Sequence, residues 1–151
     1  MDADRVTLRP ATEDDAKRLF DWTNDPTARG VSFNADPIPW DTHVAWLEKK
    51  LADRACRLFI AEVDGAPVGQ VRLDAADDRA TISVSIAKAH RGRGLGVAAI
   101  RAATAHAEVI DAFILADNAA SVRAFERAGF TFAEDVEIEG RAAVRFEWTR
   151  S

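Results

Sequence analysis

Hydrophobic and polar residues alternate with a period of two in several short stretches of this chain, a pattern typical of strands with one buried face. The turn signals between the middle stretches, above all Asp64-Gly65, indicate an antiparallel meander. A final hairpin is predicted from Phe130 onward, with its turn at Glu139-Gly140. The predicted strands before that hairpin are 6–8, 58–63, 68–73, 81–86 and 113–115.

Helical patterns lie before and after the meander. Thr12 and Asp15 resemble a capping box, so a helix is expected from there to about Trp22. Further helices are predicted around 44–51, from the glycine-rich segment to Ala107, and over 119–127. The order of elements predicts a single mixed α/β domain that spans 1–151.

A glycine-rich segment, Arg91-Gly92-Arg93-Gly94-Leu95-Gly96, lies between a predicted strand and a predicted helix. Glycines let backbone N–H groups approach an anion closely, and a helix start adds unpaired donors and the positive end of its dipole. With two arginines beside them, these residues predict a phosphate-binding loop. The alternative is a turn that only joins strand and helix.

Length and composition restrict the class of protein. The 151 residues, 48% hydrophobic and 30% charged, suit one globular domain, and a net charge of −5 argues against a surface that coats nucleic acid. Cys56 is the sole cysteine, which excludes an intramolecular disulfide and a cysteine-based metal site within one chain. No stretch approaches the roughly 20 apolar residues of a membrane span. We expect a cytoplasmic protein with no metal.

A second motif runs from Asn118-Ala119-Ala120-Ser121 to Phe125 and Gly129-Phe130. Together with Arg91-x-x-Gly94-x-Gly96 it resembles the Gcn5-related N-acetyltransferases (GNAT), which carry both motifs at this separation. The resemblance implies a mixed, mostly antiparallel central sheet flanked by helices. It also implies acetyl-coenzyme A as the donor, and direct attack by a primary amine.

The resemblance further implies which residues hold the donor. The pyrophosphate rests on the amides of the glycine-rich segment, and the pantetheine arm adds like a strand to Val84–Ile86, where an N–H stabilises the oxyanion. Asn118 bonds the pantetheine arm or a water, although its position equally suits a helix N-cap. The implied donor-binding residues are Val84, Ile86, Arg91, Gly92, Arg93, Gly94, Leu95, Gly96, Asn118, Ser121 and Phe125.

Phe125 stands where members of the family often have a tyrosine that protonates the departing thiolate, and this chain has no tyrosine. The catalytic acid is therefore Ser121, another side chain or water, or none is needed, because a thiol has a pKa near about 8.5 and leaves readily. Ser121 can also be only a residue of the first helical turn.

The attacking amine must lose a proton, and three residues are candidates for the base: Glu62, His43 and His90. The alternatives are that Glu62 is an exposed strand residue, that His43 is a helix surface residue and that His90 is a loop residue. The sequence assigns none of them.

The acceptor side is similar to the acetyltransferases of the pseudaminic-acid pathway, which acetylate the 4-amino group of a nucleotide-linked deoxy-amino sugar. Asn24-Asp25-Pro26, Arg29 and His43-x-x-Trp46 carry the likeness. It implies that Asn24 and Arg29 meet phosphate or sugar hydroxyls and that His43 and Trp46 shape the sugar pocket. A core tryptophan and an exposed arginine are the simpler alternatives.

Three other functions fit parts of the chain. Leu8-Arg9-Pro10 also resembles acetyltransferases of ribosomal-protein N-termini, and the missing tyrosine suits a sensor that binds acyl-coenzyme A without catalysis. Gly94-Leu95-Gly96-Val97-Ala98-Ala99 fits a dinucleotide-binding fingerprint, but an antiparallel meander is the wrong context for it. As partners we expect a small-molecule amine and a second copy of the chain through the final hairpin, and neither nucleic acid nor membrane.

Overall fold

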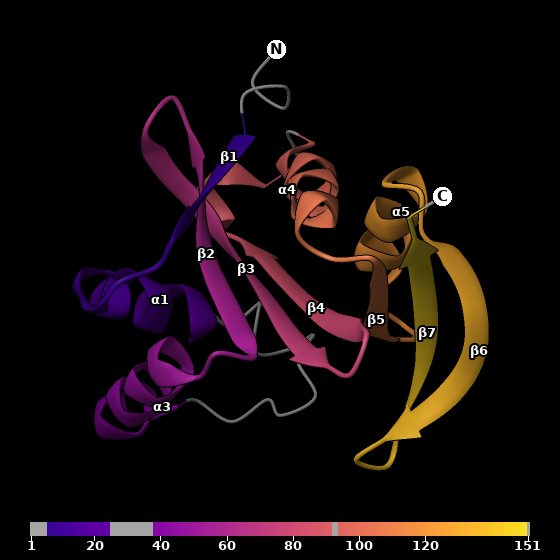
Figure 1. The fold of residues 1–151 in the computed structure, drawn as a ribbon, viewed down its shortest axis with the longest axis horizontal. Coiled ribbons are helices and arrows are strands. Elements are labelled where there is room, and N and C mark those ends of the chain that lie inside the picture. Colours follow the sequence, from indigo (N-terminus) through magenta and orange to yellow (C-terminus); the bar gives the residue numbers. More distant parts are fainter. Residues whose placement is uncertain (1–5, 25–37, 92–93, 151) are drawn as a thin grey trace.

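The computed structural model describes residues 6–24, 38–91 and 94–150. Its centre is one seven-stranded sheet in the order β1-β2-β3-β4-β5-β7-β6 (Figure 1). Every neighbouring pair is antiparallel except β4 with β5. This confirms the mixed, mostly antiparallel sheet and excludes the parallel sheet of a dinucleotide-binding module. The strands are β1 (Val6–Pro10), β2 (Cys56–Val63), β3 (Ala66–Ala76), β4 (Arg79–Ile86), β5 (Val109–Leu115), β6 (Thr131–Ile138) and β7 (Arg141–Thr149).

Helices cover both faces of this sheet. Alternate residues of a strand point to opposite faces, and on β2 Ile60 packs with residues of α1 and α3 while Phe59 belongs to the core under α4. We call these the α1–α3 face and the α4–α5 face. The helices are α1 (Ala16–Thr23), α3 (Trp40–Ala52), α4 (Leu95–Ala103) and α5 (Ala119–Arg127), with short 3-10 turns η2 (Glu13–Asp15), η3 (Lys88–His90) and η4 (Thr104–His106). None of the helices within the described ranges is long and apolar enough to cross a membrane.

The structure corrects two predicted boundaries. β5 begins at Val109 rather than at Phe113, because Asp111 interrupts the apolar run although ion pairs hold it within the strand. α4 ends at Ala103 and a 3-10 turn replaces its expected last turn to Ala107. Both predicted hairpin turns are present, with left-handed backbone at Asp64-Gly65 and at Glu139-Gly140.

The sheet opens between β4 and β5. Only Ala80 with Ile110 and Thr81 with Asp111 are paired, after which the two strands diverge. The rest of β4, residues 82–86, is paired with β3 on one side and not with β5 on the other. The backbone of β4 therefore presents a free edge toward the other half of the sheet.

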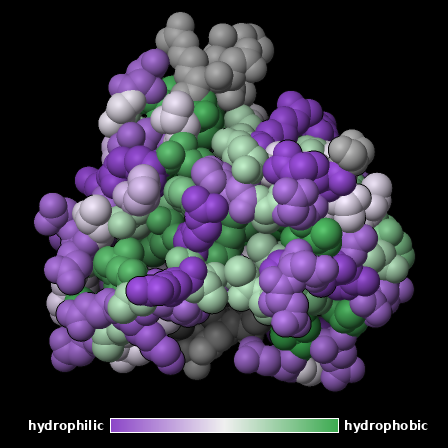
Figure 2. Space-filling model, in the orientation of Figure 1, coloured by the Kyte–Doolittle hydropathy of each residue, from purple (hydrophilic) through white to green (hydrophobic). Residues whose placement is uncertain are grey.

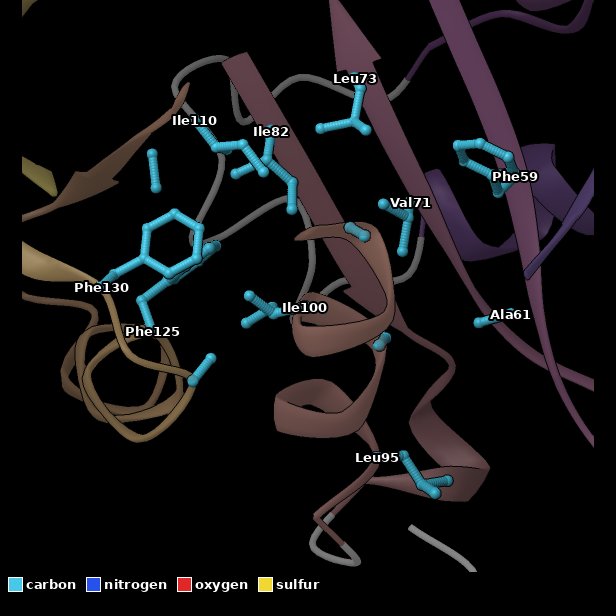
Figure 3. Packing of buried hydrophobic residues seen from close by; sticks show 14 of the residues in the cluster. Phe59, Ala61, Val71, Leu73, Ile82, Leu95, Ile100, Ile110, Phe125 and Phe130 are labelled. Atoms are coloured by element: carbon cyan, nitrogen blue, oxygen red, sulfur yellow. The ribbon is translucent and has the colours of Figure 1, made fainter. Parts of the chain in front are cut away.

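Core residues fill the closed end of this opening. Ile100 of α4 lies between the β3–β4 side and the pair Phe125 and Phe130, and Ile82 and Ile110 cover it from the sheet (Figure 3). Large side chains from both halves therefore meet below the open end.

The predicted capping box at Thr12 is confirmed, and it belongs to a buried ion cluster. Asp15, with 1% of its surface exposed, accepts from the Thr12 N–H (2.9 Å) and from Arg9, which also contacts Glu62 (2.9 Å). The hydrogen bonds from Arg9 hold the pKa of the Asp15 carboxyl at about 2, below its ordinary 3.8. The charged carboxylate therefore stabilises the folded state.

Acid should remove that stabilisation. The folded pKa is depressed, so the contribution is complete above the unfolded pKa and is lost as the pH falls from about 4 to about 2. A shift of this size corresponds to about 2 kcal/mol. Unfolding free energies measured across this range should fall more in the wild type than in Asp15→Asn. Asp21→Asn, the same change at an exposed carboxylate, is the matched control, and an equal slope in wild type and Asp15→Asn would contradict the account.

Candidate active site

A cleft of about 660 Å³ occupies the space where β4 and β5 diverge. Its walls come from β4 and β5, and its ends from the start of α4 and the start of α5. Figure 2 shows hydrophobic side chains in the middle of the face seen in Figure 1, with hydrophilic side chains on both sides. The lining residues are 82–86, His90, Arg91, 94–97, Ile100, 113–115, Asn118, Ala120, Ser121, Ala124 and Phe125.

The β4 wall depends on a close backbone approach from β3. Gly69 pairs with Ile86, and a Cβ atom built at Gly69 would lie 2.4 Å from the Ser85 carbonyl oxygen and 2.9 Å from Cδ1 of Ile86. No side chain fits there without moving β4. Val84 and Ile86, both predicted donor-binding residues, line the cleft beside this contact.

The glycine-rich segment ends in the start of α4. Gly94 is the N-cap and adopts a left-handed conformation (φ +75°), which glycine reaches without strain. The Ala98 N–H donates to the Gly94 carbonyl (3.3 Å), so the N–H groups of Leu95, Gly96 and Val97 precede the helical hydrogen-bond ladder. They stand at the cleft with the positive end of the helix dipole.

Arg91 joins this segment to β4, because its Nε donates to the Ile86 carbonyl (3.0 Å). It also lines the cleft, as do Gly94, Leu95 and Gly96. The predicted Gly92 and Arg93 lie outside the described residues. The described part of the segment thus has the N–H groups of a helix start and the positive charge that favour an anion.

The opposite end of the cleft is the start of α5. Asn118 is its N-cap, and its side-chain oxygen accepts from the Ser121 N–H (3.3 Å), so the capping interpretation is confirmed. Both residues also line the cleft. Phe125 is 5% exposed, and its ring meets that of Phe130 edge-on with centroids 5.1 Å apart. It lines the cleft as an apolar wall with no proton to donate.

The three candidates for the base fall in different places. His90 lines the cleft. Glu62 is part-buried on β2, where Arg9 binds its carboxylate, so the interpretation as an exposed strand residue is wrong. His43 is 2% exposed, and the interpretation as a helix surface residue is also wrong. Neither Glu62 nor His43 is among the residues that line the cleft.

His43 belongs to the packing between α1 and α3. Its Nε2 lies 3.0 Å from the Ala16 carbonyl oxygen, and its ring lies between Trp40 and Trp46 and against Phe20. Burial lowers the pKa of the imidazole, which keeps the ring neutral at pH 7. A buried residue in this position can shape an acceptor pocket only through its neighbours.

The other predicted acceptor residues are only partly described. The Asn24 side chain makes two hydrogen bonds to the backbone of Ile38 (2.8 and 2.7 Å). Its amide therefore joins the residue before segment 25–37 to the residue after it. Arg29 lies in that segment, outside the described residues. Trp46 is part-buried, and the Arg72 guanidinium lies 5.5 Å from its ring centroid.

Arg72 is a neighbour of the cleft that the sequence analysis missed. Its Nη2 donates to Oγ of the cleft residue Ser83 (3.3 Å), and its Nε donates to Asp74 (2.7 Å), which Lys50 also contacts (3.3 Å). Two cations therefore share one carboxylate beside the β4 wall. Gly69 was missed as well, although a glycine within an alternating strand signals a close backbone approach.

A comparison with protein-family models shows which family the chain belongs to. The model described as "Acetyltransferase (GNAT) domain" matches residues 5–131. The chain belongs to the GNAT acetyltransferases. It is thus an acetyl-coenzyme A-dependent N-acetyltransferase, as the two motifs implied. The same comparison leaves the acceptor open.

Solved structures agree with this GNAT fold. The aminoglycoside acetyltransferase AAC(6')-Ib in complex with ribostamycin and coenzyme A is 25% identical, with a TM-score of 0.83 and coverage of 97% of this chain and 94% of that one. Spermidine N-acetyltransferase from Vibrio cholerae in complex with coenzyme A and spermine is 22% identical (TM-score 0.86, coverage 96% and 95%). The microcin C7 self-immunity acetyltransferase MccE in complex with acetyl-coenzyme A and AMP is 17% identical (TM-score 0.82, coverage 97% and 93%). No curated protein sequence matches the chain.

Proposed function

We propose that this GNAT protein binds acetyl-coenzyme A in the cleft between β4 and β5 and transfers the acetyl group to the primary amine of a small molecule. The free edge of β4, which lines the same cleft as the N–H groups at the start of α4, is the observation that carries the proposal. The pyrophosphate takes the α4 end with Arg91, and Gly92 and Arg93 follow in the same segment. The pantetheine arm runs along Val84 and Ile86.

The proposed reaction is a direct attack. The neutral amine nitrogen bonds to the thioester carbonyl carbon, and an N–H of β4 at Val84–Ile86 stabilises the oxyanion. The C–S bond then breaks and coenzyme A leaves as the thiolate. Phe125 cannot protonate that thiolate, so Ser121 or water does so, and the amine proton passes to His90 or to water.

For the acceptor we propose an amino sugar that carries an anionic group, in particular a nucleotide-linked one. The excess cation of the Lys50–Arg72–Asp74 group lies beside Ser83 on the cleft wall, where it favours an anion and disfavours a polycation such as a polyamine. The Trp46 ring contacts the Arg72 guanidinium on one side and stacks with the His43 ring. In this way Trp46 and His43 shape the proposed acceptor pocket. Asn24 and Arg29 are the residues proposed to meet the phosphate or the sugar hydroxyls.

Two similar proteins make this acceptor class reasonable. Aminoglycosides, one of which AAC(6')-Ib binds, are amino sugars without phosphate. MccE binds AMP, a nucleotide. A nucleotide-linked amino sugar combines the amine of the first ligand with the phosphate of the second.

Release of free thiol from acetyl-coenzyme A tests the function. The panel holds a nucleotide-linked 4-amino sugar, kanamycin, spermidine and a short peptide with a free N-terminus, with Arg72→Gln beside the wild type. We expect turnover with the nucleotide-linked sugar and a higher KM for it in Arg72→Gln. Arg57→Gln is the matched control, because Arg57 also lies 5.5 Å from an aromatic ring, that of Phe59, and neither Arg57 nor Phe59 is among the residues that line the cleft.

The other outcomes separate the alternatives. Release that depends on the peptide would indicate an acetyltransferase of protein N-termini, and release with spermidine or kanamycin would contradict the anionic acceptor. Binding of acetyl-coenzyme A without release across the panel would favour a sensor. Failure to bind acetyl-coenzyme A would overturn the proposal.

A further inference from the structure

The two halves of the sheet are joined at one short junction. β1 to β4 form one half and β5 to β7 the other, and Ala80–Ile110 and Thr81–Asp111 are the paired residues between them. The cleft begins directly beyond these pairs. The junction is therefore the point from which the two cleft walls diverge.

Five charged side chains surround the junction. Arg79 of β4 binds Asp111 of β5 through two hydrogen bonds (2.8 and 2.6 Å), and Arg145 of β7 binds the same carboxylate (2.8 Å). Glu147 contacts both arginines, and Glu134 of β6 binds Arg145 (2.7 Å). We call Arg79, Asp111, Glu134, Arg145 and Glu147 the junction cluster.

The junction cluster lies on the α1–α3 face, opposite the packed core. Ile110 and Ala112, the neighbours of Asp111 along β5, belong to the core on the α4–α5 face, so Asp111 points the other way. Asp111 is 8% exposed, and Arg79 and Arg145 are more exposed than it. A carboxylate buried to this degree is costly unless its cations stay in place, which fixes β4 and β7 relative to β5.

We propose that Arg79 and Asp111 are positioning residues that set the separation of β4 and β5, and through it the affinity for acetyl-coenzyme A. Arg79 directly precedes the paired Ala80, and Asp111 is itself paired with Thr81. Loss of the ion pair therefore acts on the two residues from which both walls diverge. The proposal rests on the proposed function, since it takes the ligand of the cleft to be the acetyl donor.

The chain contains a matched control at the β1 edge of the sheet. Asp15 is also a buried carboxylate held by two arginines, Arg9 and Arg18, and Arg9 also binds Glu62. This cluster joins β1, β2, η2 and α1, and none of its residues is among those that line the cleft. Its loss should cost stability without changing the cleft.

Calorimetric titration of acetyl-coenzyme A is the first test. We expect Arg79→Ala to raise Kd about tenfold and Arg79→Lys to recover part of that loss. Arg9→Ala should lower the melting temperature to a similar degree and leave Kd within about twofold of the wild type. If Arg79→Ala does not fold, Glu147→Gln removes one of the two carboxylate partners of Arg79 and should raise Kd by a smaller factor.

A ligand-free measurement separates this proposal from the proposed function. Spin labels on Lys88→Cys and Asp117→Cys, both exposed residues that follow β4 and β5, report the separation of the walls in a Cys56→Ser background. Arg79→Ala, or Glu147→Gln in its place, should shift or broaden the distance distribution, and Arg9→Ala should not. If the wild type fails to bind acetyl-coenzyme A, the proposed function falls and this distance still tests the junction. Lower stability with unchanged Kd and unchanged distances would overturn the proposal.

Discussion

Replacing Gly69 with alanine should abolish acetyl-coenzyme A binding while most of the sheet still forms. The new Cβ would lie 2.4 Å from the Ser85 carbonyl oxygen, which is backbone and cannot rotate away. β4 must therefore shift at Ser85 and Ile86, the part of the strand that lines the cleft. Overpacking of this kind costs about 1–3 kcal/mol of unfolding free energy. Chemical denaturation and calorimetric titration measure the two effects.

Gly96→Ala is the control for the folding part of this prediction. A Cβ atom at Gly96 would meet Cγ1 of the same residue, Ile86, at 3.8 Å, an ordinary van der Waals distance. An alanine there also suits a helix better than glycine. The melting temperature of Gly96→Ala should thus match or exceed that of the wild type. Unchanged binding and stability in Gly69→Ala would show that β4 is not held as the structure describes.

Truncation of Phe125 to alanine should destabilise the protein by about 3–5 kcal/mol, the range for a buried aromatic ring. Phe125 of α5 is 5% exposed, and its ring packs edge-on against that of Phe130 in the core below the cleft. Since domains are stable by only about 5–15 kcal/mol, the variant should unfold at much lower denaturant concentration. Equilibrium denaturation measures the difference.

Phe132→Ala is the matched control for Phe125→Ala. Phe132 is the same residue type on the edge strand β6 but is 56% exposed, with one ring contact to Phe146. Its loss should change the unfolding free energy far less, because little surface is removed from water. Equal losses in the two variants would contradict the placement of Phe125 in the core.

Local patterns in the sequence predicted most of the fold. Alternation located β2, β3 and β4, the Asp64-Gly65 turn predicted their antiparallel order, and Thr12 and Asn118 marked two helix starts. These features depend on residues close together in the chain. The glycine-rich segment was also located from the sequence, because its pattern, glycines between a predicted strand and a predicted helix, is local.

Long-range contacts could not be predicted in this way. Arg79 and Asp111 are 32 positions apart and Arg79 and Glu147 are 68 apart, and nothing in their neighbours indicates that they meet. His43 has a polar side chain at a helical spacing, yet contacts with α1 bury it. The acceptor residues were the least predictable, because their roles depend on how helices and strands distant in sequence come together.

Titration of acetyl-coenzyme A into Ala120→Trp tests the central claim most directly. Ala120 is exposed and lines the cleft at the start of α5, so an indole there fills the space proposed for the donor without entering the core. Ala119→Trp is the control, because Ala119 is the adjacent exposed residue and is not among the residues that line the cleft. The account predicts wild-type affinity for Ala119→Trp and a Kd at least about tenfold higher for Ala120→Trp. Equal affinity in both variants would show that acetyl-coenzyme A does not bind between β4 and β5.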